Sequence, residues 1–91
     1  MCGVNDKDIL PEDKILSAAS CTTNAITPVV KVLNDQYGIK QGHVETVHSY
    51  TNDQNLIDNW HKGDRRGRSA ALNMVITETG AAKAVAKLCR R

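Results

Sequence analysis

The clearest pattern of hydrophobic positions lies between Thr22 and Tyr37. Its apolar residues recur at helical spacing, at Ile26, Val29, Val30 and Leu33. Asn24 or a preceding threonine can cap the start of this segment, and Gly38 stands where a helix commonly ends. Pro28 falls inside or near the first turns, which leaves the exact start open by a few residues. The pattern therefore predicts a helix over about residues 22–37.

Other segments show different patterns. Residues 14–20, 43–50 and 70–77 are short apolar or alternating runs that predict strands, the first of them leading up to Cys21 and the second ending near His48. Residues 49–68 are rich in Asn, Asp and Gly, which predicts a long structured loop. Residues 80–88 are rich in alanine and predict a short helix that opens at Thr79 and Gly80.

The composition sets bounds on this picture. The chain has 91 residues, of which 41% are hydrophobic, but only 3% are aromatic and none is Phe. Its core must be built from Val, Ile, Leu and Ala, which suits part of a larger domain as well as a complete small one. A net charge of +2 does not indicate a polyanion-binding protein. No run is long enough to span a membrane and no signal peptide is visible, so we expect a cytoplasmic protein.

The chain has three cysteines, Cys2, Cys21 and Cys89, with no Cys-x-x-Cys pair. This argues against both a disulfide framework and a zinc ribbon, and indicates reduced thiols and no metal site. Cys21 lies at the start of the predicted helix, where unpaired N–H groups and the helix dipole stabilise a thiolate. His48 could serve as its base if the two predicted strands are neighbours. The simpler alternatives are a buried structural cysteine and a structural histidine.

Four segments resemble a known family. Residues 17–24, Ser-Ala-Ala-Ser-Cys-Thr-Thr-Asn, strongly resemble the active-site signature of the glyceraldehyde-3-phosphate dehydrogenase family. The spacing from Cys21 to His48 is also the family's, and residues 48–54 look like its second catalytic segment. Residues 65–71 and 79–84 resemble the two segments that follow. The similarity extends from about Gly3 to Lys87.

The resemblance implies a chemistry. Cys21 would attack the aldehyde of glyceraldehyde 3-phosphate, His48 would take the proton, and hydride would pass to NAD, leaving a thioester that inorganic phosphate releases as 1,3-bisphosphoglycerate. The residues that match the family's substrate and phosphate sites are Ser20, Thr22, Thr51, Thr79 and Gly80. Thr79 and Gly80 at a helix start are equally typical of an ordinary cap.

The resemblance also implies partners. The basic segment of residues 61–68 would lie at the contact between subunits of a homotetramer and border the neighbouring subunit's cofactor. Nucleic-acid binding is the rival interpretation of such a cluster, and we do not expect it because no aromatic residues alternate with the arginines. A metal site is not expected either, since the cysteines and histidines match no common zinc spacing.

The fold that the resemblance implies is α+β, with helices packed on a mixed or antiparallel sheet, as part of the family's catalytic domain. Residues 1–13 would be a remnant of the link from a dinucleotide-binding domain, residues 14–88 a partial catalytic domain and residues 89–91 a divergent tail. The glycines form no Gly-x-Gly-x-x-Gly motif, so the Rossmann domain is absent and no cofactor-binding residue is assigned. NAD and NADP therefore both stay open.

Two departures and two alternatives complete the interpretation. Ala25 stands where many family members have a second cysteine, which leaves the expected chemistry intact. Because the sheet and the cofactor domain would be incomplete, we expect the chain by itself to be inactive. The alternatives are a dehydrogenase of erythrose 4-phosphate and a non-catalytic fragment that associates with intact subunits.

Overall fold

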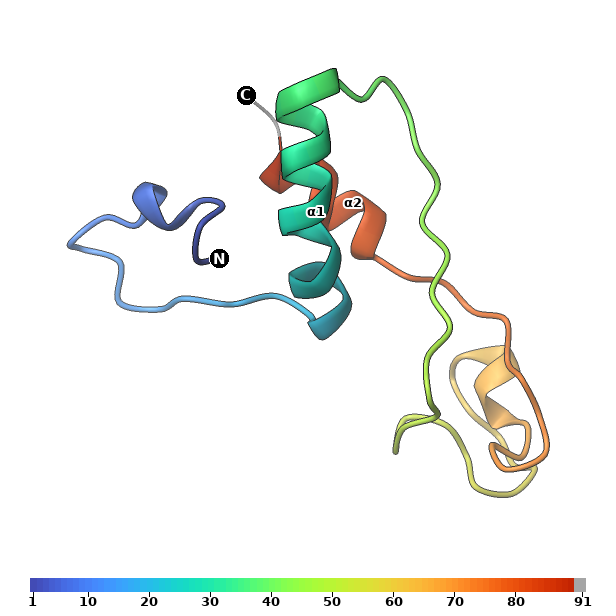
Figure 1. Cartoon of the computed structure of the whole chain (residues 1–91). Helices are drawn as coiled ribbons and strands as arrows, with labels where there is room; N and C mark the ends of the chain where they lie inside the picture. Colours follow the sequence, from blue (N-terminus) through green and yellow to red (C-terminus); the bar gives the residue numbers. More distant parts are fainter. Residues whose placement is uncertain (90–91) are drawn as a thin grey trace. The chain divides into compact units, whose positions relative to one another are not determined.

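The computed structural model describes residues 1–89 and contains four helical elements (Figure 1). Their order is the 3-10 helix η1 (Asp6–Asp8), the α-helix α1 (Cys21–Tyr37), the 3-10 helix η2 (Asp64–Gly67) and the α-helix α2 (Ala81–Leu88). The chain divides into two compact units, one formed by Met1–Glu45 with the segment that starts at Gly80, and the other by Thr46–Thr79. We call them the helical unit and the loop unit.

The expected sheet is not formed within residues 1–89, so the α+β prediction is wrong: the helices are not packed on a sheet. The predicted strands at 14–20, 43–50 and 70–77 contain extended and turn-like segments without strand pairing (Figure 1). A residue pattern can favour an extended chain, but a strand also needs ladder hydrogen bonds from a second segment. Several apolar side chains in these segments are consequently exposed, with Ile15, Val47 and Met74 each at 92%.

The two predicted α-helices are confirmed. Helix α1 begins at Cys21, one residue before the expected start, and its cap is Ser20 rather than Asn24 or a preceding threonine. It ends at Gly38, whose φ of 73° lies in the region that favours glycine. Pro28 lies in the helix interior, where it removes one backbone donor without ending the helix.

The buried residues of α1 are not the apolar residues that predicted the helix. Its fully buried residues are Thr23 and Thr27, whereas Val29 and Leu33 of the predicted stripe are exposed. Helix α1 packs against α2, which presents two buried residues, Ala81 and Val85, one turn apart. Small side chains on both helices permit close approach, so the α1–α2 contact forms the small core of the helical unit.

Helix α2 spans eight residues and follows Gly80, as predicted. The amide of Cys89 donates to the carbonyl of Val85 at 3.0 Å and closes the last turn. Of the predicted divergent tail, residues 90 and 91 lie outside the described part of the chain. In the part that the structure describes, no helix has the length and apolar character needed to cross a membrane.

The loop unit is held together without a strand in its described residues. Three backbone bonds cross it: Asn55 N–H to the carbonyl of Arg66 at 3.0 Å, Asn59 N–H to that of Gly67 at 2.9 Å, and Ala70 N–H to that of Asn55 at 2.9 Å. The expected long loop at residues 49–68 is therefore ordered and includes η2. Gly67 is buried against the Asn59 backbone, and a Cβ at this position would collide with the Asn59 carbonyl oxygen.

Candidate active site

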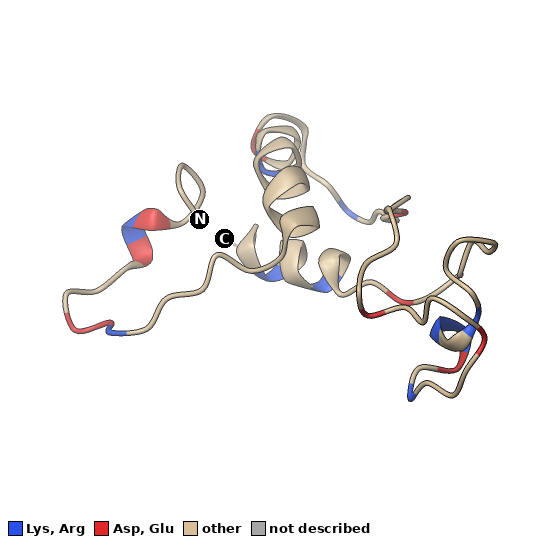
Figure 2. Cartoon of the chain, turned by 90° about the horizontal axis from the view of Figure 1, so that it is seen from below, with Lys and Arg blue, Asp and Glu red and all other residues tan. Residues whose placement is uncertain are grey.

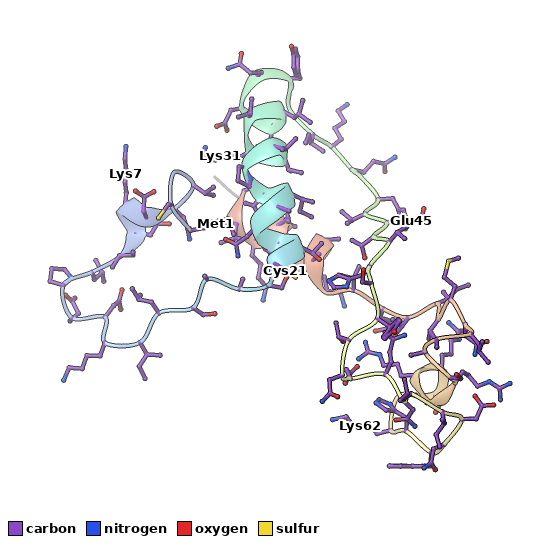
Figure 3. All side chains as sticks on the ribbon, turned by 60° about the horizontal axis from the view of Figure 1, so that its bottom comes forward. Met1, Lys7, Cys21, Lys31, Glu45 and Lys62 are labelled. Carbon is purple, nitrogen blue, oxygen red and sulfur yellow. The ribbon has the colours of Figure 1, made fainter. Side chains whose placement is uncertain are left out.

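Cys21 is the first residue of α1 and its side chain is exposed (Figure 3). The sequence prediction of a cysteine at a helix start is confirmed, while the strand expected before it is absent from the described residues. At the first turn of a helix the backbone N–H groups have no carbonyl acceptor within the helix. The positive end of the helix dipole lies there and stabilises an anion. The position therefore favours the thiolate form, which is the nucleophilic form of cysteine.

The two predicted anion-binding residues beside Cys21 have different surroundings. Ser20 is the N-cap: its Oγ accepts from the Thr23 amide at 3.1 Å and lies 2.8 Å from Thr23 Oγ1. One hydroxyl can accept two hydrogen bonds and donate one, so capping leaves Ser20 the capacity for one further bond. Thr22 lies in the same first turn and is partly exposed. The structure thus groups Ser20, Cys21 and Thr22 at one helix end.

Sequence reasoning missed the structural role of Asn24. Its Nδ2 donates to the carbonyl oxygen of Ala18 and to that of Ser20, the second at 2.9 Å. Between these two carbonyls lies Ala19, whose φ of 62° is the one positive value among the described non-glycine residues. An asparagine shortly after a cap is a known signal for a side chain that reaches back to the backbone, and this signal was available in the sequence.

His48 lies in the loop unit, whereas Cys21 lies in the helical unit, and each is described within its own unit. The Nδ1 atom of His48 is 2.6 Å from the carbonyl oxygen of Ser49. A carbonyl oxygen can only accept, so Nδ1 carries the proton in this contact. In the neutral ring Nε2 is then the nitrogen with the basic lone pair, which is the tautomer that a general base needs.

The remaining predicted site residues are distributed over both units. Thr51 is exposed in a turn in which the Gln54 amide donates to its carbonyl at 3.0 Å and its own amide donates to Gln54 Oε1 at 3.3 Å. Thr79 is exposed at the end of the loop unit. Gly80 is the N-cap of α2, and its carbonyl accepts from the Ala84 amide at 3.0 Å. The predicted helix start at Gly80 is confirmed, and its anion-binding role stays a prediction.

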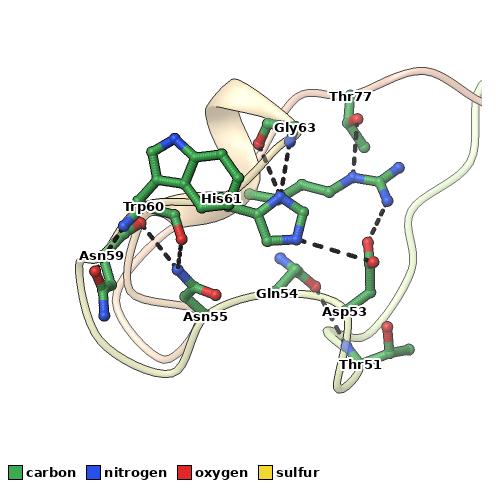
Figure 4. A network of polar contacts seen from close by, with 10 residues as sticks. Thr51, Asp53, Gln54, Asn55, Asn59, Trp60, His61, Gly63 and Thr77 are labelled. Carbon is green, nitrogen blue, oxygen red and sulfur yellow. Dashed lines mark hydrogen bonds and ion pairs between the residues drawn. The ribbon is translucent and has the colours of Figure 1, made fainter.

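The basic segment of residues 61–68 makes contacts inside the loop unit (Figure 4). Arg66 pairs with the Asp53 carboxylate and its Nε donates to Thr77 Oγ1 at 3.3 Å, while Arg65 donates to the Ile76 carbonyl at 3.2 Å. The ribbon around η2 accordingly alternates between basic and acidic residues, whereas α1 is uncharged over most of its length (Figure 2). Arg68 lies 3.9 Å from the Asp58 carboxylate, so all three arginines in this segment have internal partners.

The imidazole of His61 is part of the same network. The Gly63 amide donates to His61 Nδ1 at 2.8 Å, so the ring proton of the neutral form lies on Nε2, which is 3.9 Å from Asp53 Oδ1. An open depression of about 430 Å³ adjoins this network. Its lining comprises Asp58, Asn59, Trp60, His61, Asp64, Gly67 and Arg68. Across residues 1–89, no three or more His, Cys, Asp or Glu side chains are grouped so that they could hold a metal ion.

Comparison with known proteins identifies the family. A model of the glyceraldehyde 3-phosphate dehydrogenase C-terminal domain matches residues 20–91. The chain is 78% identical over 85 residues to a glyceraldehyde-3-phosphate dehydrogenase-like protein of Pseudomonas aeruginosa, covering 93% of this chain and 18% of that protein. It is 57% identical over 84 residues to the glyceraldehyde-3-phosphate dehydrogenase of Thermotoga maritima, covering 92% of this chain and 25% of that enzyme.

The match to the C-terminal domain begins at the cap of α1 and includes Cys21, His48 and the basic segment. The chain belongs to the glyceraldehyde-3-phosphate dehydrogenase family. It spans about a quarter or less of the length of these two relatives.

Proposed function

We propose that this chain carries the nucleophile and the base of a phosphorylating glyceraldehyde-3-phosphate dehydrogenase. The reaction is oxidation of glyceraldehyde 3-phosphate, with NAD and inorganic phosphate, to 1,3-bisphosphoglycerate. The observation that carries the proposal is the exposed Cys21 at the first turn of α1, inside the segment that matches the family. A thiol there has the access and the stabilised negative charge that nucleophilic attack requires.

The chain's own residues would perform three tasks. The Cys21 thiol first gives its proton to His48; the thiolate then adds to the aldehyde carbon, which forms a C–S bond and moves the carbonyl electron pair onto oxygen, and this oxygen takes the proton from His48 to give a hemithioacetal. His48 Nε2 removes the hydroxyl proton as this intermediate is oxidised to the thioester. A phosphate oxygen then attacks the thioester carbon, the C–S bond breaks, and Cys21 leaves again as a thiolate.

NAD supplies the acceptor for the hydride in such a reaction. Dinucleotides bind most often at a strand, a glycine-rich turn and a helix. Residues 1–89 form no strand, so the described residues do not fit that mode of binding, and we assign none of them to NAD. We propose that the binding of NAD depends on sequence of the kind that makes up the remaining length of the relatives.

Ser20, Thr22, Thr51, Thr79 and Gly80 are our candidates for the two phosphate groups. Support comes from the first turns of α1 and α2, where the helix dipole places partial positive charge that favours an anion. Ser20 adds a hydroxyl that keeps one hydrogen-bonding capacity beyond its capping role.

The proposal is tested by placing residues 3–87 of this chain in the full-length Thermotoga maritima relative, in place of its matching segment. We expect the hybrid to form NADH from glyceraldehyde 3-phosphate only when phosphate is present, and more slowly from erythrose 4-phosphate. Cys21→Ser should abolish turnover, and His48→Asn should lower kcat by roughly 10²–10⁴-fold, the usual contribution of a general base. Ala25→Cys is the matched control, and its activity should not change.

Retention of most of the activity by the Cys21→Ser hybrid would exclude Cys21 as the nucleophile. A second measurement concerns the 91-residue chain alone, for which we expect no detectable NADH formation. Sustained turnover by this chain without any partner would contradict our assignment of NAD binding to other sequence.

A second candidate function is association with intact subunits of the family without catalysis. The observation that favours it is the exposure of apolar residues in unpaired extended segments, such as Ile15 and Val47, together with Trp60 at 82% beside the basic segment. We expect the tagged chain to co-purify with the Thermotoga maritima enzyme when the two are co-expressed. A monodisperse monomer that elutes separately from the enzyme would rule this candidate out.

A further inference from the structure

We infer that Asn24 is a positioning residue for Cys21, acting through the left-handed backbone of Ala19. This inference rests on the proposed role of Cys21 as the nucleophile. Asn24 is exposed and touches no reacting atom in the proposal. Its role would be to hold the segment that places the Cys21 thiol at the start of the helix.

The first step of the argument is the backbone of residue 19. Ala19 has a φ of 62°, a conformation in which the Cβ of an L-residue lies too close to the following carbonyl. Alanine has no polar side chain to compensate for this crowding. The conformation therefore persists only where surrounding contacts hold it, and such positions are concentrated at functional sites.

The second step is the set of contacts that hold it. Both hydrogens of the Asn24 carboxamide are used, one for the carbonyl of Ala18 and one for that of Ser20, which flank the strained residue. The backbone amide of Asn24 also donates to the Ser20 carbonyl at 2.9 Å. From the other side, the Ala19 amide donates to Ser17 Oγ at 3.1 Å. Asn24 thus connects the Ala18–Ala19 and Ser20–Cys21 peptide groups, on either side of the Ala19–Ser20 peptide, to the first turn of α1, and we call these contacts the Asn24 clamp.

The third step links this clamp to the thiol. Ser20, whose carbonyl Asn24 holds, is the N-cap of α1, and Cys21 follows it directly. The Ser20 hydroxyl accepts from the Thr23 amide, Thr23 and Thr27 are buried, and α1 packs against α2. The helix side of the clamp is therefore anchored, and movement is possible mainly on the side of Ala18 and Ala19. Release of the carboxamide would let residues 18–20 relax and would shift Cys21 relative to the first turn of α1, where the helix dipole stabilises a thiolate.

The test measures alkylation of each cysteine in the full 91-residue chain with iodoacetamide at pH 7, resolved by peptide mass spectrometry. For Asn24→Ala we expect the Cys21 rate to fall by roughly fivefold to tenfold, because less thiolate is stabilised. The rate at Cys2 should not change. Asn34→Ala is the matched control. The Asn34 side chain also makes a hydrogen bond with the backbone, because its Oδ1 accepts from the Ile39 amide at 3.1 Å, but it lies at the far end of the same helix.

The decisive variant is the double change Ala19→Gly with Asn24→Ala. Glycine adopts a positive φ without a steric penalty, so it removes the need for the clamp and should restore at least half of the Cys21 rate. If Asn24→Ala also loses far-UV helical signal, recovery of both signal and rate in the double variant supports the inference. An unchanged rate in Asn24→Ala, or no recovery in the double variant, overturns it.

The two proposals can fail separately. If Cys21 of the unmodified chain reacts no faster than Cys2, there is no activated thiol to position, and the proposed nucleophile and this inference both fall. If Cys21 reacts fast and stays fast in Asn24→Ala, only the role of Asn24 is wrong.

Discussion

The helical unit and the loop unit are ordered by different means. In the helical unit, backbone bonds inside α1 and α2 provide the order, and a small contact of Thr23, Thr27, Ala81 and Val85 joins the helices. In the loop unit the described residues include only one short 3-10 helix, and order comes from bonds between residues more than ten positions apart, such as Arg66 with Asp53 and Ser69 with Leu56. The comparison teaches that local bonds order each helix of the first unit, with one long-range contact between the helices, whereas the order of the second unit depends almost entirely on a few long-range contacts.

The largest expected effect is that of Gly67→Ala in the loop unit. The added Cβ would collide with the Asn59 carbonyl, and because the obstacle is backbone, the loop must open to accept it. We expect a loss of about 3 kcal/mol, at the upper end of what overpacking costs. Amide hydrogen exchange should show lost protection at Asn55, Asn59 and Ala70, while α1 stays protected.

The matched control is Gly42→Ala, where no atom lies within 4 Å of the added Cβ. We expect a change within about 0.5 kcal/mol, as for most surface substitutions. Unchanged protection at Asn59 in Gly67→Ala would mean that the close approach of these two backbones does not organise the loop unit.

The next effect is that of Val85→Ala in the helical unit. Val85 is 5% exposed and lies in the α1–α2 contact, so removing its two methyl groups should destabilise the unit by about 1 to 2 kcal/mol. Urea unfolding followed by far-UV circular dichroism measures the change. Val32→Ala, at a position that is 62% exposed on α1, should be neutral or slightly stabilising because alanine favours helix. Equal effects of the two changes would contradict the assignment of the core.

A smaller effect is expected for Ser20→Ala at the start of α1. The Thr23 amide loses its acceptor, and loss of an N-cap typically costs about 1 kcal/mol. The same unfolding measurement applies, and Ser20→Asp should preserve most of the stability because aspartate also caps. If Ser20→Asp were as destabilising as Ser20→Ala, the hydroxyl of Ser20 would matter for something other than the cap.

The smallest effect is expected for Asp53→Asn. The Arg66–Asp53 pair is partly exposed, at 33% and 48% of the two side chains, so solvent screens it and we expect a loss below about 1 kcal/mol. The loss should be smaller in 0.5 M salt, because salt weakens surface ion pairs. For comparison, Lys31→Gln removes the Lys31–Asp35 pair of α1 and should change stability by about 0.3 to 0.5 kcal/mol. A larger, salt-independent loss for Asp53→Asn would show that this contact is more than a surface pair.

The helices were predictable because their signals are local. Gly38 ends α1 as expected, and Gly80 precedes α2 as expected, since both positions depend on the conformation of single residues. The cap was misplaced by a few residues because Ser20, Thr22 and Asn24 are all suitable capping residues and only coordinates separate them. Which residues of α1 are buried had no local signal: Thr23 and Thr27 are fully buried, whereas Val29 and Leu33 of the apolar pattern are exposed.

The candidate site shows the same division. The sequence motif selected Cys21, and its place at a helix start is confirmed by the structure. The bonds from Asn24 to the carbonyls of Ala18 and Ser20 had a signal in the sequence that was missed, whereas the positive φ of Ala19 has no signature in the sequence. The pairing of Cys21 with His48 stays a prediction. The tautomer of His48 became assignable only through its contact with the Ser49 carbonyl.

The sequence by itself determined the family, the helices and the thiol at the start of the first helix, because i to i+4 bonds, caps and motifs are encoded by residues close together. Only the tertiary structure decided that residues 14–20, 43–50 and 70–77 are not strands. It also decided that the Gly67 backbone lies against Asn59 and that Thr23 and Thr27 are the fully buried residues of α1. These outcomes depend on which distant segment supplies a hydrogen-bonding or packing partner. A residue pattern indicates which secondary structure a segment can form, but not whether a second segment is placed to pair or pack with it.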